Sequence, residues 1–442
     1  MKTILLFGAG KSSSVLITYL LEQAPRHGFL LRVVDADLTL AQAKIGSSSH
    51  GVALGFDSTD SQLRTAEIGQ ADLVISLLPP TLHQLVAMDC LQLGKHLLTA
   101  SYVSQELKQL DSELRSKDLL FLCEMGLDPG IDHMSAMAIF AAIHDQGGTV
   151  HSFVSHCGGL VSPASDNNPW HYKISWNPRN VVTAGQAGAH FLLNGKEVNL
   201  SCEELFGQEN TVTVEGLGKY GWYPNRDSLS YLSLYDLKHV NTFIRTTLRH
   251  PDFIKGWKKL LALSLTQDSP SYYLQHATLG KAFAYHFEKF KLQEIIARFK
   301  SHDPLFDKQL QFLGATTDTT PLRSDQFTPA QLLQQALEKK LILANEDRDM
   351  IIMLHEIGYS IKGQDRQLIS QLVVEGENSI RTAMAKTVGL PLAIAALLVL
   401  QKKIGLRGVQ IPTQKDIYEP ILQELKKEGM LFTEKDSPVI GH

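Results

Sequence analysis

The first 124 residues of the chain alternate short apolar runs with amphipathic stretches. Six of the runs have the length of a strand, at residues 3–7, 29–34, 52–56, 72–78, 96–100 and 119–123. The stretches between them, such as residues 12–23 and 82–94, repeat apolar positions with the period of a helix. Continuous apolar runs are typical of parallel strands, which are buried on both faces. The alternation therefore predicts an α/β fold with a doubly wound parallel sheet, a dinucleotide-binding Rossmann domain, over residues 1–124.

The pattern changes after Glu124. Four later segments alternate apolar and polar residues as antiparallel strands do, at residues 148–159, 211–219, 347–357 and 367–376. Three segments between them have helical periodicity, at residues 254–266, 279–299 and 329–344. We therefore expect a second α+β domain, formed by residues 125–244 and 344–377, with a mainly helical insertion at residues 245–343. The remaining residues, 378–442, are predicted to form C-terminal helices that pack on the first domain.

Composition narrows the class of protein. A chain of 442 residues with 44% hydrophobic and 20% charged residues is long enough for two or three globular domains. Its net charge of -4 argues against a nucleic-acid partner, because phosphate binding needs a clustered basic excess. The longest apolar run, residues 390–400, is shorter than the roughly 18 residues of a membrane span, and the N-terminus lacks a signal-peptide pattern. We therefore expect no membrane partner. The four cysteines show no metal-binding spacing and indicate a reducing, cytoplasmic location: Cys90, Cys123, Cys157 and Cys202.

A glycine-rich turn follows the first predicted strand. Gly8 and Gly10 lie between that strand and the first helix, where a helix N-terminus can hold the pyrophosphate of a dinucleotide. The dinucleotide fingerprint has Gly or Ala three residues after Gly10; this chain has Ser13, which is also small enough for close packing of helix on strand. A GxG sequence alone also occurs in tight structural turns. Its position between a strand and a helix is what predicts a dinucleotide site.

The acidic residue of the fingerprint is expected at the end of the second strand, where the chain has Asp35. A carboxylate at this position accepts hydrogen bonds from the adenosine ribose and repels a 2′-phosphate. The next residues, Ala36 and Asp37, provide no Arg to bind such a phosphate. We therefore expect NAD to be the favoured cofactor, with NADP as the alternative. The alternative role of Asp35 is to cap a helix or a turn.

Two further strand ends are expected beside the nicotinamide half of the cofactor. Leu78 precedes the Pro-Pro turn that ends the fourth strand, and Ser101 follows the fifth strand. The carboxyl ends of parallel strands meet at the edge of the sheet where ligands bind. Both residues are therefore predicted to contact the cofactor.

Five unusual segments occur in one order along the chain: TASYVS (99–104), GLDPGIDHM (126–134), HCGGLVSPASDNNPWHYKISWNPRN (156–180), YPNRDSL (223–229) and TFIRTTLRHPDF (242–253). Together they resemble the glutamate-forming saccharopine dehydrogenases, also called saccharopine reductases. The resemblance implies a Rossmann domain, a second domain for substrate binding and dimerisation, a homodimer, and a small-molecule amino-acid substrate with one secondary amine and three carboxylates. It extends over nearly the whole chain, so we expect no attached lysine–oxoglutarate reductase half. Members commonly use NADP, which differs from the preference that Asp35 predicts.

Three carboxylates need cationic partners, and Arg provides the bidentate geometry. Within the resembling segments, Arg179 and Arg249 are the preferred candidates for carboxylate binding, followed by Arg226 and Lys173. Arg245 is a weaker candidate. Each of these residues has the alternative role of a solvated charge or a structural ion pair. The resemblance also implies substrate contacts by Ser101, Tyr102, Asp128 and Thr247.

The implied reaction removes hydride from the lysine-derived ε-carbon of saccharopine, and hydrolysis of the resulting imine releases glutamate and 2-aminoadipate 6-semialdehyde. The candidates for proton transfer and positioning are Tyr102, Asp128 and Cys157, each inside a resembling segment. Asp128 can act as a base if burial raises its pKa. The alternatives are a turn cap for Asp128 and buried structural roles for Tyr102 and Cys157. No metal site is predicted, because Asp132 and His133 have no third ligand at a recognisable spacing.

Two other functions stay open at the level of sequence. The first is a dehydrogenase of a carboxylated polyamine, such as carboxynorspermidine or carboxyspermidine, although the Arg-bearing segments argue against a substrate with one carboxylate and several amines. The second is a nucleotide-binding regulatory protein without catalysis, for which Ser13 in the glycine fingerprint is the only support. The physiological direction of the reaction, lysine synthesis or breakdown, is not encoded in these motifs.

Overall fold

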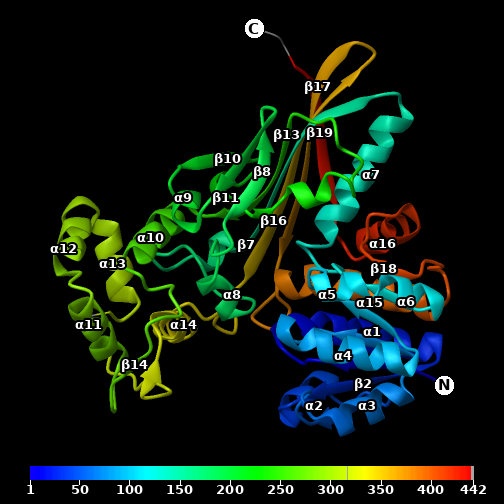
Figure 1. Cartoon of the computed structure of the whole chain (residues 1–442), viewed down its shortest axis with the longest axis horizontal. Helices are drawn as coiled ribbons and strands as arrows, with labels where there is room; N and C mark the ends of the chain where they lie inside the picture. Colours follow the sequence, from blue (N-terminus) through cyan, green and yellow to red (C-terminus); the bar gives the residue numbers. More distant parts are fainter. Residues whose placement is uncertain (316, 440–442) are drawn as a thin grey trace.

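The computed structural model describes residues 1–315 and 317–439 of the chain. Residues 316 and 440–442, which fall in the predicted segments 245–343 and 378–442, lie outside the described residues. Two large sheets and a group of helices make up the fold (Figure 1). The helices of residues 279–312 lie at the left of Figure 1, away from the first sheet at the lower right.

The first sheet is all parallel, with seven strands in the order β18-β6-β5-β4-β1-β2-β3. Alternate residues of the interior strand β1 enter two different cores: Ile4 and Leu6 on one face, Leu5 and Phe7 on the other. Burial on both faces explains the continuous apolar runs. The predicted doubly wound sheet is confirmed. Its elements are β1 Lys2–Phe7, α1 Ser14–His27, β2 Phe29–Asp35, α2 Leu38–Ile45, β3 Gly51–Gly55, α3 Ser61–Gln70, β4 Leu73–Ser76, α4 Pro80–Leu93, β5 His96–Thr99, α5 Gln105–Gln109, α6 Asp111–Ser116, β6 Leu120–Leu122 and β18 Gly408–Gln410.

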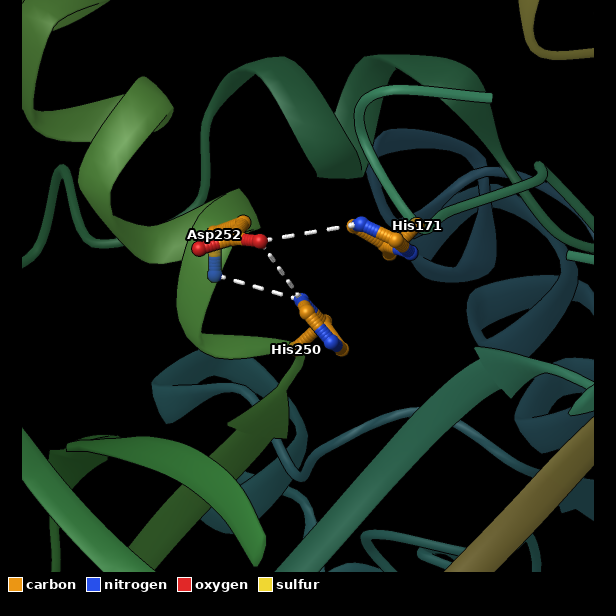
Figure 2. A group of neighbouring side chains, drawn as sticks. All are labelled: His171, His250 and Asp252. Atoms are coloured by element: carbon orange, nitrogen blue, oxygen red, sulfur yellow. Dashed lines mark hydrogen bonds and ion pairs between the residues drawn. The ribbon is translucent and has the colours of Figure 1, made fainter. Parts of the chain in front are cut away.

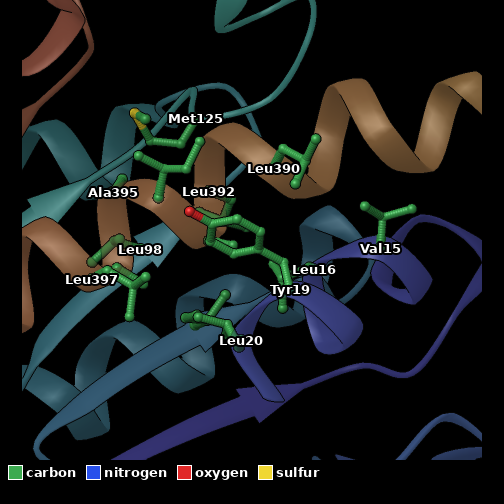
Figure 3. Packing of buried hydrophobic residues seen from close by; sticks show 14 of the residues in the cluster. Val15, Leu16, Tyr19, Leu20, Leu98, Met125, Leu390, Leu392, Ala395 and Leu397 are labelled. Atoms are coloured by element: carbon green, nitrogen blue, oxygen red, sulfur yellow. The ribbon is translucent and has the colours of Figure 1, made fainter. Parts of the chain in front are cut away.

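The apolar helix α15 (Ala383–Leu400) lies against α1 of the first sheet. Leu390 and Leu392 of α15 enter the same core as Leu16 of α1, and Figure 3 shows these side chains facing one another. The two helices approach closely because Gly389 has no side chain; a Cβ there would lie 2.9 Å from the Leu16 nitrogen. By length and composition α15 could cross a membrane, but 89% of it is buried inside the protein. Such burial is typical of a core helix.

The second sheet has ten strands. Its main path runs β10-β11-β13-β7-β16-β17-β19, and β8, β9 and β12 join at the side of β13. Only β7 and β13 are parallel neighbours along this path. α7 (Ile131–Asp145) connects β6 of the first sheet to β7 of this sheet. The strands are β7 Thr149–Val161, β8 Ala189–Leu193, β9 Lys196–Leu200, β10 Asn210–Val214, β11 Gly218–Pro224, β12 Arg226–Asp227, β13 Thr242–Arg249, β16 Asp349–Ile361, β17 Gln364–Glu375 and β19 Phe432–Pro438.

The helical part shares a core with the second sheet; this core includes Trp257, Phe283 and Leu333 from helices and Ile244 from β13. Two details differ from the prediction. The predicted start at residue 245 falls inside β13, which continues to Arg249. The predicted helix at 279–299 is two helices, because Lys291 takes a left-handed conformation with φ 56° between them. The elements are α8 Pro178–Val182, α9 Cys202–Leu205, α10 Pro251–Ala262, β14 Tyr272–Tyr273, α11 Leu279–Lys289, α12 Gln293–His302, α13 Pro304–Phe312, β15 Gln326–Phe327 and α14 Pro329–Lys340.

The C-terminal segment contains strands where only helices were predicted. Besides α15 and α16 (Lys415–Lys427), it forms β18, at the edge of the first sheet beside β6, and β19, at the edge of the second sheet beside β17. β18 is three residues long, and the seven residues of β19, FTEKDSP, are almost all exposed. Edge strands of this kind are held mainly by backbone hydrogen bonds. Their sequences therefore carry no apolar pattern that could predict them.

Candidate active site

The glycine loop after β1 has a backbone that a side chain would disturb. Gly8 has φ 102°, and a Cβ there would lie 3.0 Å from the Leu77 carbonyl oxygen. Ser13 is buried at the start of α1, and its hydroxyl donates a 2.9 Å hydrogen bond to the Gly10 carbonyl. The serine therefore fits the fingerprint position of Gly or Ala and adds a bond that holds the loop. This loop and the helix N-terminus behind it have the form of a dinucleotide pyrophosphate site.

Asp35 lies at the end of β2, and its carboxylate is used within the loop region. One oxygen accepts the Ala9 N–H at 2.7 Å and the other accepts the Asp37 N–H at 3.0 Å. The ammonium of Lys44 in α2 donates to the Ser14 hydroxyl at 2.7 Å and to the Gly10 carbonyl. Burial lowers the pKa of Lys44 to about 8, so the group is still largely a cation at neutral pH. The region therefore combines an acid tied to the backbone with a cation beside the glycine loop.

A buried chain of hydrogen bonds joins the carboxyl ends of β4 and β5. His83 in α4 lies between the Ser76 hydroxyl at 2.8 Å and the Ser101 hydroxyl at 2.7 Å. Burial lowers the pKa of His83 to about 4, so the imidazole is neutral at physiological pH. Leu78 lies in the turn between β4 and α4. No role was predicted for His83 from the sequence; its position one turn into a helix after a strand end was the available signal.

One face of β13 presents three of the predicted site residues in a row. Arg245, Thr247 and Arg249 alternate along the strand and therefore project to the same side. Cys157 of β7 pairs directly with Thr247. Burial raises the pKa of the Cys157 thiol well above its ordinary value, so the group is a neutral thiol and no base. The period of two in TFIRTTLR was the sequence signal that both arginines share one face.

Arg245 is the centre of the polar cluster. Its guanidinium is 2% exposed and donates to the Asp128 carboxylate, to Asp132 Oδ2 at 2.8 Å and to the Tyr102 hydroxyl at 3.4 Å. The Tyr102 hydroxyl in turn donates to Asp128 Oδ1 at 3.1 Å. Asp128 lies between β6 and α7, and Asp132 lies in the first turn of α7, so this cluster connects the two sheets. For binding of substrate carboxylates, Arg245 was ranked below Arg179 and Arg249, and that ranking stays a prediction; in the structure Arg245 is paired with two carboxyl groups of the protein itself.

The pKa values of the two carboxyl groups are shifted in opposite directions. Burial raises the pKa of Asp128, and the opposing charge of Arg245 does not outweigh it. Burial also opposes ionisation of Asp132, but His133, Arg245 and the Gly130 N–H together outweigh it and lower its pKa. The turn cap foreseen for Asp128 is provided by Asp132, which accepts the Gly130 N–H at 2.6 Å. Two neighbouring carboxyl groups with pKa values shifted in opposite directions are typical of acid–base sites.

A second layer of buried groups holds this cluster in place. His133 donates to Glu124 at 2.8 Å and also contacts the Tyr235 hydroxyl, while the Tyr231 hydroxyl donates to Glu124 at 3.0 Å. The Arg245 guanidinium stacks over the Tyr231 ring at 4.7 Å. Sequence reasoning missed Glu124, Tyr231 and Tyr235, because isolated polar residues among apolar neighbours carry no pattern of their own. Such a network fixes the orientation of the groups in contact with it.

Arg249 has no carboxylate partner among the described residues. The side chain is 4% exposed, it donates one hydrogen bond to the Leu248 carbonyl, and its Nε–H is buried without a partner in the part of the chain that the structure describes. The guanidinium lies over the rings of Tyr172 at 5.2 Å and Phe253 at 5.8 Å. A buried cation without a counter-charge is costly in a folded protein unless a ligand supplies the anion.

The other predicted cations have different surroundings. Arg226 is exposed, has φ 54° and lies over the Tyr102 ring at 5.4 Å. Lys173 forms a buried ion pair with Asp347 at 2.6 Å, and Arg179 forms an ion pair with Asp268 while one third of its side chain stays exposed. The substrate role of Lys173 and Arg179 stays a prediction, and it would require these ion pairs to open.

Comparison with known proteins decides the family. A model described as the saccharopine dehydrogenase NADP binding domain matches residues 4–122, and one described as the saccharopine dehydrogenase C-terminal domain matches residues 126–430. The chain belongs to the saccharopine dehydrogenase family. It is 31% identical to the saccharopine dehydrogenase [NADP(+), L-glutamate-forming] of Pyricularia oryzae, over 98% of this chain and 99% of the relative. Apo saccharopine dehydrogenase (L-Glu forming) from Saccharomyces cerevisiae matches the fold with a TM-score of 0.88 and 29% identity, covering 99% of this chain and 100% of that one.

Longer relatives share the same similarity. The mitochondrial alpha-aminoadipic semialdehyde synthase of Mus musculus is 32% identical over 98% of this chain but only 47% of its own length. The chain thus spans about half the length of the semialdehyde synthases that it matches.

The expectation that NAD is favoured is wrong. The family model over residues 4–122 describes an NADP binding domain, and the fungal relatives are named as NADP(+) enzymes. The prediction assumed that the Asp35 carboxylate is free to bind the ribose. It considered only Ala36 and Asp37 as positions for a cation that binds the 2′-phosphate. In the structure the Asp35 carboxylate accepts hydrogen bonds from the Ala9 and Asp37 amides, and α2 brings the Lys44 ammonium back beside the glycine loop.

Proposed function

We propose that this chain is an oxidoreductase that converts L-saccharopine, NADP and water reversibly to L-glutamate, 2-aminoadipate 6-semialdehyde and NADPH. The relatives that cover it end to end carry this activity in their names. The observation that carries the choice of substrate is the buried guanidinium of Arg249, which a substrate carboxylate would pair. A polyamine substrate has too few carboxylates to use both this residue and Arg226.

Each residue of the cluster has a role in this proposal. Arg249 and Arg226 bind carboxylates of the substrate, and Tyr102 positions the secondary amine through its hydroxyl. Asp128 in its ionised form accepts the proton of that amine, and later returns it to the leaving amine nitrogen. Arg245 stabilises the ionised form, and Asp132 holds Arg245 in position. Cys157 and Thr247, which pair on neighbouring strands, line the site as neutral groups.

The reaction needs an electron-pair acceptor and a water molecule. When bound, NADP supplies the acceptor for the hydride of the substrate ε-carbon. Loss of that hydride and of the amine proton leaves a C=N bond, to which water adds. The C–N bond of the resulting carbinolamine then breaks. The former ε-carbon becomes the aldehyde carbon of 2-aminoadipate 6-semialdehyde, and the nitrogen leaves as the amino group of glutamate. The glycine loop with Gly8, the Ser13 contact and the Lys44 cation fit a dinucleotide phosphate at this edge of the sheet.

The test is turnover of L-saccharopine by the purified chain at mildly alkaline pH with NADP, followed by absorbance of the reduced nicotinamide. Glutamate should appear in equal amount. Turnover of carboxynorspermidine in place of saccharopine would overturn the choice of substrate. Binding of NADP without turnover of either compound would support a regulatory protein instead.

Replacing Arg249 by Met should separate activity from stability. The variant loses a charge-assisted contact of about 1.5–3 kcal/mol, so kcat/KM for saccharopine should fall about 10- to 150-fold. Thermal stability should be unchanged or higher, because an unpaired buried cation has been removed. Steady-state kinetics and a thermal melt measure the two effects. Equal kcat/KM in wild type and variant would contradict a substrate role.

Replacing Lys44 by Gln should weaken NADP binding. The KM for NADP should rise about five- to tenfold, corresponding to about 1 kcal/mol, and the difference should shrink at high salt because salt screens partly exposed charges. The matched control is Lys95→Gln, at the opposite end of β5, which should leave the KM unchanged. An unchanged KM in both variants would remove Lys44 from the cofactor site.

A further inference from the structure

A second cluster of ligand-type side chains includes the residue that follows Arg249 in the sequence. His171 lies in the segment between β7 and α8. His250 and Asp252 lie at the junction of β13 and α10. Each offers one ligand atom, and these atoms all lie within 4.8 Å of one another (Figure 2). The three side chains are each about one third exposed, which leaves the cluster accessible to an ion.

We propose that His171, His250 and Asp252 bind a divalent transition-metal ion of the zinc type. His171 Nε2 lies 3.6 Å and His250 Nδ1 lies 3.8 Å from Asp252 Oδ2. These separations are too long for hydrogen bonds. In a tetrahedral zinc site with bonds of about 2.0–2.1 Å, two ligand atoms lie about 3.4 Å apart. The two separations measured here are close to that value. Two imidazoles and one carboxylate are a typical zinc ligand set, with a fourth position for water.

The His171 ring is held in position by Asp166, which lies outside the proposed ligand set. Asp166 Oδ2 accepts a 2.6 Å hydrogen bond from His171 Nδ1, because an ionised carboxylate can only accept. This bond occupies Nδ1 and leaves Nε2 facing Asp252. A carboxylate that fixes the tautomer of a ligand histidine is common around protein metal sites. The other oxygen, Asp166 Oδ1, is buried with no hydrogen-bond partner among the described residues, so it could accept from a metal-bound water.

His250 also presents a lone pair. Its Nδ1 accepts the Asp252 N–H at 3.2 Å as the cap of α10, so Nδ1 carries no proton and points toward Asp252. The two imidazole rings are stacked with centroids 3.9 Å apart, which brings both nitrogens to the same side, as Figure 2 shows. An ion bound there would replace the long cap bond with a metal–nitrogen bond. It would also connect the segment that carries Tyr172 with the strand end that carries Arg249.

The sequence did not predict this site. His171 and His250 belong to different segments of the chain, so no short ligand spacing marks them. Magnesium and calcium prefer sites made of oxygen ligands, so this set should select zinc, copper or nickel.

The test uses the full chain without an affinity tag, treated with EDTA and then dialysed. Titration with ZnCl₂ in a calorimeter should show one ion per chain, and ZnCl₂ but not MgCl₂ should raise the melting temperature. The double variant His171→Asn/His250→Asn should bind zinc at least tenfold more weakly. Asn keeps a cap acceptor at position 250 and tolerates the left-handed φ of 48° at position 171, so the metal-free variant should stay folded.

The matched control is His190→Asn. His190 lies on β8 with Glu197 at 3.3 Å and Asp227 at 3.6 Å, but among the described residues it belongs to no group of three side chains whose ligand atoms come together. This variant should bind zinc as wild type does. The proposal is overturned if the double variant keeps the wild-type affinity, or if the titration of wild type shows no zinc binding. Neither readout depends on saccharopine turnover.

Discussion

Asp128→Asn should lower kcat for saccharopine oxidation by about 10²- to 10⁴-fold, the usual contribution of a positioned proton-transfer group. The substitution keeps the shape of the side chain and its contact with Tyr102 but removes the base. Burial raises the pKa of Asp128 above its ordinary value of 3.8. The wild-type rate should therefore fall as the pH falls through that raised pKa, because a protonated carboxyl cannot accept a proton. Rate–pH profiles of both proteins measure this, and the variant should lack the acid limb.

Asp132→Asn distinguishes a base from a structural carboxylate. Asp132 has a lowered pKa and contacts Arg245, but in the proposed reaction it transfers no proton. Its variant should lose stability and keep the acid limb of the rate profile. If Asp128→Asn retains both the wild-type kcat and that limb, another group is the base.

Arg245→Met should lower the free energy of unfolding by about 3–5 kcal/mol, because it leaves two buried carboxyl groups without their common partner. Urea unfolding followed by circular dichroism at neutral pH measures the loss. Arg179→Met is the matched control, since it breaks an Arg–Asp pair that is largely accessible to solvent, and it should cost less than about 1 kcal/mol.

The loss in Arg245→Met should depend on pH. In wild type the lowered pKa of Asp132 contributes stability at neutral pH that is lost as the pH falls through that pKa. In the variant, Asp128 and Asp132 should hold protons more firmly in the folded than in the unfolded chain, so acid favours the folded state. The difference in the free energy of unfolding between wild type and variant should become smaller as the pH falls from about 7 to about 4. A difference that stays constant over this range would mean that the guanidinium contributes through packing alone.

The fold could be predicted where burial imposes a period on the sequence. The parallel sheet of the first unit is buried on both faces, and its apolar runs match the observed strands to within a few residues. β18 and β19 could not be predicted, because one is too short and the other too exposed to carry a period. The homodimer and the cytoplasmic location stay predictions.

The site could be predicted in part. The resembling segments named Tyr102, Asp128 and Arg249, and the structure brings the first two into contact with Arg245. The partners of each charged group could not be read from the sequence, because Asp347, Asp268 and Lys44 reach their partners through the tertiary fold. The error over the cofactor has this origin: the identity of Asp35 was known, but not what its carboxylate would bind.

The position of β18 has a consequence for how the protein is made. The first sheet takes its seventh strand from residues 408–410, and the apolar face of α1 is covered by α15. When the first 124 residues leave the ribosome, they therefore have an open sheet edge beside β6 and an uncovered apolar helix face. Both features persist until nearly the whole chain has been synthesised. The N-terminal unit cannot finish folding before the second one is translated, and the nascent chain needs protection from aggregation during that interval.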